Sequence, residues 1–224
     1  MIDWQQIDTV LLDMDGTLLD LHYDNFFWLS HVPKRYAEIH DKDEEASRQA
    51  LHSRFEASRG TLDWYSVDYW SEQLQVDVPA LKHEIQHMIQ VRPHVEDFLR
   101  RLHHSDKKLV LVTNAHRKAL ELKLANTDIE RWFDAIVVSH DFKVPKEEIE
   151  FWHRLHALHP FVPSRTLLVD DTESVLDSAH RYGISHLLTL LQPDSKLQKR
   201  LDTRFRGIHH FDEIMPEFDD PNDG

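Results

Sequence analysis

Residues 10–20 read VLLDMDGTLLD, and this stretch decides the fold. The apolar run from Val10 to Leu12 predicts a strand inside a sheet, whereas Asp13 and Asp15 must be solvated, paired or bound to a cation. Because residues two apart in a strand point the same way, both carboxylates should project from the carboxyl end of this strand, where open α/β sheets bind ligands. A solvated strand-to-loop junction would show the same pattern. The rest of the chain decides between the two.

Four more apolar runs repeat the pattern of the first. They are KLVLVTN (108–114), AIVVSH (135–140), TLLVDD (166–171) and HLLTLL (186–191). The intervals between them carry apolar residues at helical spacing and are long enough for crossover helices. Strands that alternate with helices predict an α/β fold, with a parallel sheet covered by helices on both faces.

The interval between the first and second apolar runs is too long for a single crossover. Residues 20–90 contain only helical patterns, such as EEASRQALHSRFEAS and LDWYSVDYWSEQL. We therefore expect a helical domain of residues 20–90, inserted into a core made of residues 1–19 and 91–224. The last seven residues, 218–224, have the composition of a disordered tail.

Composition restricts the partners. The chain has 224 residues, 41% of them hydrophobic, and a net charge of −14, so its field disfavours nucleic acid polymers and anionic membranes. It has no cysteine, which excludes disulfides and thiolate chemistry. The start MIDWQQID has no signal-peptide pattern, and no apolar run approaches the length of a membrane span. We expect a cytoplasmic protein that acts on a small molecule. The oligomeric state is not indicated.

Side chains suited to cations or phosphate follow the predicted strands. They are Asp13 and Asp15, Thr113 and Asn114, Lys146, and Asp170 and Asp171. Parallel strands end at one edge, so these groups should converge in one cleft. Four carboxylates repel one another unless a divalent cation lies among them, and oxygen ligands suit Mg²⁺. The hydroxyl, the amide and the lysine supply donors for phosphate oxygens, since the chain has no glycine-rich phosphate loop.

This arrangement resembles the haloacid dehalogenase-like (HAD) phosphohydrolases. Their four motifs are matched in order by DMDGT (13–17), TN (113–114), Lys146 and DD (170–171). The resemblance implies a HAD-like, Rossmann-type core and identifies the helical insert as a C1-type cap. Four stretches, extending over nearly the whole chain, are similar to the bacterial GMP/IMP 5′-nucleotidases: LLDMDGTLLDLHYDN, LDWYSVDYWSEQL, LLVTNAH and PKEEIEFWH.

The resemblance implies a role for each carboxylate. Asp13 is implied as the nucleophile that forms an aspartyl-phosphate, and Asp15 as the acid that protonates the leaving alkoxide and later activates water. Mg²⁺ is implied as the cofactor, held by the Asp13 carboxylate, the Asp15 backbone carbonyl and Asp171. Asp170 would be a further ligand or a neighbour of the ligands.

The resemblance also implies that Thr113, Asn114 and Lys146 hold the phosphate oxygens. Lys143 occupies a position where many relatives have glycine, which raises the question of whether Lys143 or Lys146 reaches the phosphate. The spacing from Ser139 favours Lys146.

The implied activity is that of a phosphoric monoester hydrolase acting on purine nucleoside 5′-monophosphates. GMP and IMP carry an N1–H donor where AMP presents an acceptor, so a carboxylate of the cap could select the base. The insert offers Asp20, Asp24, Asp63 and Asp68. We expect Asp68 to contact the base, because Tyr65 and Tyr69 flank it and could stack on the ring. The other aromatic residues of the insert should form its core.

Other functions are weighed against this one. A phosphatase of phosphoglycolate or a sugar phosphate shares the chemistry. A β-phosphoglucomutase-like phosphomutase would need cations for a second phosphate, and the insert carries Lys34, Arg35, Arg48, Arg54 and Arg59. A dehalogenase is disfavoured, because a halide needs no proton from Asp15. A non-enzymatic binding module is disfavoured too, because no catalytic carboxylate is missing.

One motif points to different chemistry. HEIQH (83–87) matches the HExxH signature of zinc proteases and lies in a predicted helix. In a chain with 18 histidines a chance match is plausible, and the full set of HAD motifs competes with it. We favour Mg²⁺ at the strand ends over zinc at this motif.

Overall fold

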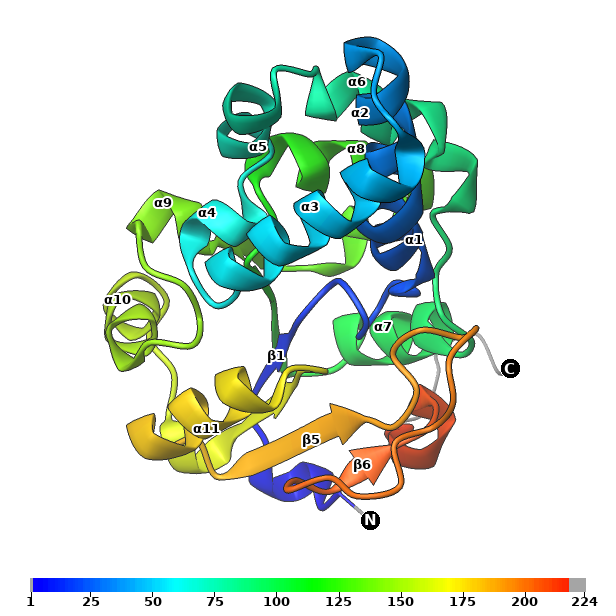
Figure 1. The fold of residues 1–224 in the computed structure, drawn as a ribbon. Coiled ribbons are helices and arrows are strands. Elements are labelled where there is room, and N and C mark those ends of the chain that lie inside the picture. Colours follow the sequence, from blue (N-terminus) through cyan, green and yellow to red (C-terminus); the bar gives the residue numbers. More distant parts are fainter. Residues whose placement is uncertain (1, 218–224) are drawn as a thin grey trace.

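The computed structural model describes residues 2–217 and contains a six-stranded parallel sheet (Figure 1). Its strands are β1 (Thr9–Leu12), β2 (Lys108–Thr113), β3 (Ala135–Val138), β4 (Thr166–Val169), β5 (His186–Leu190) and β6 (Gly207–Ile208). The spatial order is β3-β2-β1-β4-β5-β6, which places β1 between β2 and β4. The five strands predicted from apolar runs are confirmed. The sixth was missed, because two residues in a polar segment form no apolar run. The predicted tail, 218–224, lies outside the described residues.

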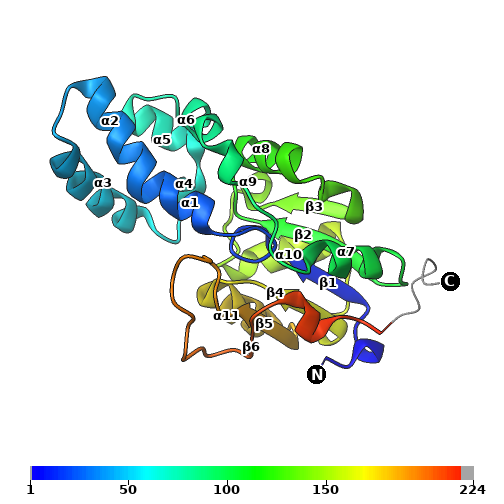
Figure 2. The same cartoon turned by 90° about the vertical axis from the view of Figure 1, so that its right-hand side faces the viewer.

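Helices cover both faces of the sheet, as predicted (Figure 2). On β1, Val10 and Leu12 join an apolar cluster with helix α7 (Val95–His103), while Leu11 joins a second cluster on the opposite face. That second cluster includes residues of helices α10 (Ile149–Leu158) and α11 (Glu173–Tyr182). The side chains of β1 therefore alternate between two cores, which explains why the whole strand is apolar.

A layer of helices follows β1 and lies beyond the carboxyl ends of the strands (Figure 2). We call it the helical insertion. It consists of α1 (His22–Phe26), a π-helical turn (Phe27–His31), α2 (Val32–His40), α3 (Glu44–Ser58), α4 (Leu62–Tyr65), α5 (Val67–Leu74) and α6 (Val78–Glu84). Its apolar side chains form a third cluster with Phe27, Phe55 and Trp70 at its centre, so the aromatic core expected for the insertion is present.

Local sequence signals start four of these helices. The first turns of α3, α4, α5 and α6 donate backbone N–H groups to the side chains of Asp43, Thr61, Ser66 and Asp77. Such N-caps satisfy donors that a helix start otherwise leaves without partners. The helical pattern of the insertion is therefore encoded by caps as well as by apolar spacing.

The HEIQH motif does not lie on one α-helix, contrary to the prediction. Helix α6 ends at Glu84, Ile85 has a non-helical conformation (φ −115°, ψ 16°), and Gln86–Met88 form a 3₁₀ turn. A zinc-protease motif needs its two histidines one α-helical turn apart on a continuous helix. The sequence match therefore lacks the structural context that would support zinc binding.

No helix among residues 2–217 is long and apolar enough to cross a membrane.

Candidate active site

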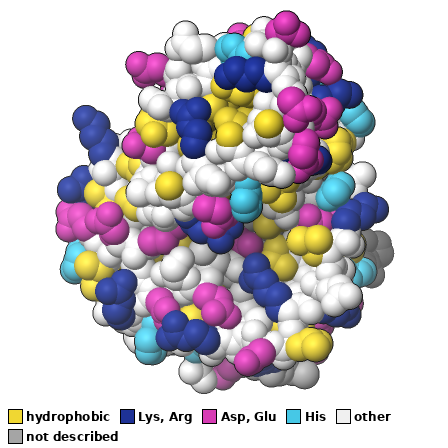
Figure 3. Space-filling model, in the orientation of Figure 1, with side chains coloured by type: hydrophobic (Ala, Val, Ile, Leu, Met, Phe, Trp, Pro, Cys, Tyr) yellow, Lys and Arg dark blue, Asp and Glu magenta, His cyan; other side chains and the backbone are white. Residues whose placement is uncertain are grey.

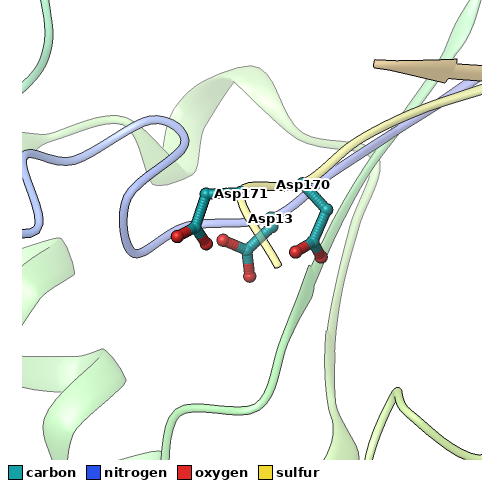
Figure 4. A group of neighbouring side chains, drawn as sticks. All are labelled: Asp13, Asp170 and Asp171. Carbon is teal, nitrogen blue, oxygen red and sulfur yellow. The ribbon is translucent and has the colours of Figure 1, made fainter. Parts of the chain in front are cut away.

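Three buried carboxylates meet at the carboxyl ends of the two central strands (Figure 4). Asp13 follows β1, while Asp170 and Asp171 follow the neighbouring strand β4. Each offers a carboxylate oxygen, and these oxygens lie within 4.8 Å of one another. Within residues 2–217, no other group of three or more His, Asp or Glu side chains is gathered in this way. The sheet thus brings together Asp13 of the first motif with both aspartates of the fourth.

Gly16 allows the chain to pass close to this cluster. Its φ is +85°, a conformation that favours glycine. A Cβ atom there would lie 2.7 Å from Cγ of Asp171, which is closer than real contacts permit. The glycine of the DMDGT motif is therefore required by the turn and by the neighbouring carboxylate.

Burial disfavours the charged forms of the three carboxylates. Burial, and then the neighbouring carboxylates, raise the pKa of Asp13 and of Asp171 to about 7 each, and Lys146 offsets only part of this. Burial likewise raises the pKa of Asp170 to about 6. Clustered carboxylate oxygens are the donors that Mg²⁺ prefers, and a bound divalent cation would remove the repulsion among them. The residues present therefore fit a Mg²⁺ site.

Lys146 is buried beside the cluster and lies immediately after β3 and α9 (Ser139–Phe142) in the chain. Its Nζ donates to Oδ1 of Asp13 at 2.6 Å, to Oδ2 of Asp170 at 2.7 Å and to the carbonyl of Val112 at 3.1 Å. Although burial opposes it, Asp13 and Asp170 raise the pKa of Lys146 above its ordinary value, so this lysine is charged. Lys143 is exposed and does not line the cavity described below.

Lys143 has a backbone conformation that favours glycine. It ends α9 in a left-handed conformation, with φ 55° and ψ 32°. A residue with a Cβ atom in this conformation costs about 1–2 kcal/mol. Glycine avoids that cost, but its greater freedom in the unfolded chain cancels part of the gain. We expect Lys143→Gly to raise the free energy of unfolding by about 0.5–1 kcal/mol without lowering activity. Urea denaturation measures this. Lys143→Ala is the matched control, because it keeps the Cβ atom, and an equal gain in that variant would contradict the explanation.

A chain of hydrogen bonds links the second and third motifs. The Asn114 side chain accepts from the backbone N–H of Lys146 at 3.0 Å and donates to Glu147 at 2.9 Å. The hydroxyl of Tyr65, from α4 of the insertion, donates to the other carboxylate oxygen of Glu147 at 2.7 Å. Thr113 accepts from the backbone of Ala115 at 2.9 Å, which leaves its hydroxyl hydrogen able to donate to a ligand.

Asp15 lies apart from the carboxylate cluster, although it lines the same cavity. Its side chain accepts a hydrogen bond from Nζ of Lys123 at 2.6 Å. Lys123 comes from helix α8 (Arg117–Thr127), is 2% exposed, and also donates to Asp24 of the insertion at 2.7 Å. Burial raises the pKa of Asp15 despite this partner. Lys123 lies outside the residues predicted from the sequence. The sequence did carry a sign of its burial, because Lys123 shares a face of α8 with Ala119 and Leu120, which are both buried.

A cavity of about 730 Å³ lies between the carboxylates and the helical insertion. Asp13, Thr113 and Lys146 line it on the sheet side, and aromatic residues such as Trp28 and Tyr65 line it on the insertion side. Basic and acidic side chains meet across the middle of the face shown in Figure 3, between the insertion and the sheet. The volume falls within the range of small-molecule sites, and the mixture of aromatic and charged walls suits a ligand with a ring and an anionic group.

Tyr65, Tyr69 and Asp68, which the sequence predicts to contact a base, lie in different surroundings. Tyr65 lines the cavity, whereas Tyr69 packs edge-on against Trp70, with ring centroids 5.1 Å apart. Asp68 is about half exposed, does not line the cavity and pairs with Nζ of Lys118 at 2.7 Å. This geometry gives no support to a contact between Asp68 and a substrate, which stays a prediction.

Residues 10–189 match the family model of the haloacid dehalogenase-like hydrolases, and the chain belongs to this family. It is 36% identical over 215 residues to the GMP/IMP nucleotidase YrfG of Escherichia coli (strain K12). The match covers 96% of this chain and 97% of that protein. It is 25% identical over 190 residues to a phosphorylated carbohydrates phosphatase of Thermotoga maritima, covering 81% and 84%. A crystal structure of a HAD phosphatase from Thermococcus onnurineus superposes with a TM-score of 0.78 at 20% identity, covering 93% and 96%, and shares the fold.

Proposed function

We propose that this protein is a Mg²⁺-dependent phosphomonoester hydrolase that acts through an aspartyl-phosphate. Its most suitable substrates are the purine nucleoside 5′-monophosphates GMP and IMP. The observation that carries the proposal is the carboxylate of Asp13, buried beside Asp171 and Lys146 at the floor of a cavity of nucleotide size. Membership of the hydrolase family and the 36% identity to a GMP/IMP nucleotidase support it.

The proposed reaction has two halves. In the first, an oxygen of Asp13 attacks phosphorus, the bond from phosphorus to the alcohol oxygen breaks, and Asp15 donates its proton to that oxygen. In the second, Asp15 takes a proton from water as the water attacks the phosphorus. Phosphate leaves and the Asp13 carboxylate is restored. Two carboxylates are needed because the nucleophile cannot also move the proton.

Charge neutralisation would come from groups around Asp13. Mg²⁺, when bound by Asp13, Asp171 and the backbone carbonyl of Asp15, supplies positive charge that offsets the repulsion between the nucleophile and the phosphate. The Thr113 hydroxyl would donate to a phosphate oxygen, as would the N–H of the Asn114 amide that is not used by Glu147. The three donors of Lys146 are already occupied by protein acceptors, so a contact with phosphate would replace one of them.

We propose that the helical insertion is a cap domain over residues 20–90, carried by a core of residues 1–19 and 91–224. Its separate apolar cluster and its position over the carboxyl ends of the strands support this division. The cavity walls that could meet a base, Trp28, Trp64 and Tyr65, all come from it. Selection among substrates would therefore depend on the insertion, while the core supplies the chemistry.

Substrate choice can be tested directly. Phosphate release should be faster from GMP and IMP than from AMP by about 5-fold to 150-fold, because an unpaired buried polar group costs about 1–3 kcal/mol. Sugar phosphates and phosphoglycolate are included in the same screen, the former because of the Thermotoga relative. Equal rates on AMP, or a preference for a sugar phosphate or phosphoglycolate, would refute the nucleotide assignment and leave the phosphatase chemistry in place.

The same screen, repeated on Asp68→Ala, tests the predicted contact with the base. Loss of the preference would identify Asp68 as the selector, and an unchanged preference would contradict that role.

A phosphomutase would need a second phosphate site in the insertion. Of the five cations considered for it, Arg59 alone lines the cavity in the part of the chain that the structure describes.

A further inference from the structure

An alternating row of charges runs from the proposed acid–base residue into the helical insertion. Lys123 donates to Asp15 at 2.6 Å and to Asp24 at 2.7 Å, and Asp24 accepts a second bond, at 3.0 Å, from Lys82. Asp15 belongs to the core and Lys123 to α8, whereas Asp24 comes from α1 and Lys82 from α6. The row therefore crosses the boundary between the core and the insertion.

Both lysines are held in place by their surroundings. The side chain of Lys123 is 2% exposed and that of Lys82 is 4% exposed. The Nζ of Lys82 lies 4.2 Å from the ring centroid of Phe27 and 4.9 Å from that of Tyr23, contacts that favour a cation. Solvated surface lysines show neither this burial nor these partners. Lys123 also lines the cavity, so it lies beside the reacting groups.

The orientation of the Asp15 side chain depends on this row. Lys123 is the group that hydrogen-bonds its carboxylate among the described residues. Without the ammonium group of Lys123, no cation would lie between the carboxylates of Asp15 and Asp24, which would repel each other and turn apart. A proton donor is effective only within hydrogen-bond reach of the leaving oxygen.

We propose that Lys123 is a positioning residue for proton transfer. It holds the carboxylate of Asp15 toward the leaving oxygen and, through Asp24, ties that orientation to helix α1 of the insertion. The inference rests on the proposed role of Asp15 in phosphomonoester hydrolysis. It adds a residue from outside the four motifs and connects the chemistry to the placement of the insertion.

The test compares leaving groups. Lys123→Met should lower kcat for GMP by about 100-fold, at the lower end of the effects of general acid–base catalysis, with KM little changed. On 4-nitrophenyl phosphate, the first burst of 4-nitrophenolate should persist, because that leaving group needs no proton, while steady turnover falls. A purely structural role would lower the burst and the turnover together. Arg117→Met removes an exposed cation from the same helix and should leave both unchanged.

A double-mutant cycle decides whether Lys123 acts through Asp15. If it does, Asp15→Asn/Lys123→Met should be no slower than Asp15→Asn alone, whereas multiplied losses would overturn the proposal. Lys123→Arg keeps the charge and should recover part of the loss. It allows the same cycle if the methionine variant does not fold. If Lys123→Met has a normal kcat while Asp15→Asn is impaired, the positioning role of Lys123 is refuted and the proposed function is not. A wild-type protein that releases phosphate from no phosphomonoester refutes the proposed function instead.

Discussion

Asp13→Asn is expected to abolish turnover while the fold stays intact. An amide is a poor nucleophile and a weaker metal ligand than a carboxylate, so the loss should reach at least about 10⁴-fold, the order seen when a nucleophile is removed. Burial raises the pKa of Asp13, and Lys146 keeps Asp170 as a charged partner in the variant, so we expect asparagine, which has the same shape, to leave the protein folded. Phosphate release measures the activity, and thermal unfolding measures the stability.

Two comparisons sharpen this test. Asp106→Asn changes a carboxylate on the surface and should leave the activity unchanged. Asp15→Asn should still form some phospho-enzyme but turn over slowly, because the nucleophile remains while proton transfer is lost. Near-normal phosphatase activity in Asp13→Asn would show that the nucleophile has been assigned to the wrong residue.

Removal of divalent metal is expected to have an effect of comparable size. Activity should vanish in EDTA and return with Mg²⁺ or Mn²⁺, because oxygen ligands such as Asp13 and Asp171 favour hard cations. Metal should also stabilise the fold, since it relieves the repulsion among the buried carboxylates. At a metal concentration 100 times Kd, the gain is about 2.7 kcal/mol, which appears as a rise in Tm.

The HEIQH motif provides the control for the metal. His83→Ala should change neither the activity nor its restoration by Mg²⁺, because α6 ends one residue after His83. Inactivation by this substitution, or restoration of the EDTA-treated protein by zinc alone, would overturn the magnesium assignment.

The sequence predicts the strands well because burial on both faces makes them continuously apolar. Strands β1 to β5 each stand out from their polar flanks, and β1, β2 and β4 carry candidate site residues at their carboxyl ends. Strand β6 could not be found in this way. It has only two residues, Gly207 and Ile208, and depends on pairing with β5 that is decided by tertiary contacts.

The sequence identified the residues of the strand ends better than those of the helices. The rule that parallel strands end at one edge suffices to bring Asp13, Asp170 and Asp171 together. No comparable rule fixes how a helical insertion lies on the sheet, so the partners of Asp15 were missed. For the same reason the sequence did not indicate that Asp68 pairs with Lys118 and lies outside the cavity lining. Tyr65, which lines the cavity, ends α4, whereas Tyr69, which packs against Trp70, lies in α5, and the non-helical Ser66 stands between them.

The central position of β1 constrains the order in which the newly made chain can fold. Thr9 pairs with Lys108 on one side and with Thr166 on the other, so β1 must wait until residue 166 has been synthesised before its pairing is complete. Such distant pairings make folding slow and leave apolar strands exposed meanwhile. The helical insertion is made in this interval and has an apolar cluster of its own, joined from later in the chain by Ala119 of α8. We therefore expect nascent chains to gain helix before sheet, and the carboxylate cluster to form only when β4 docks.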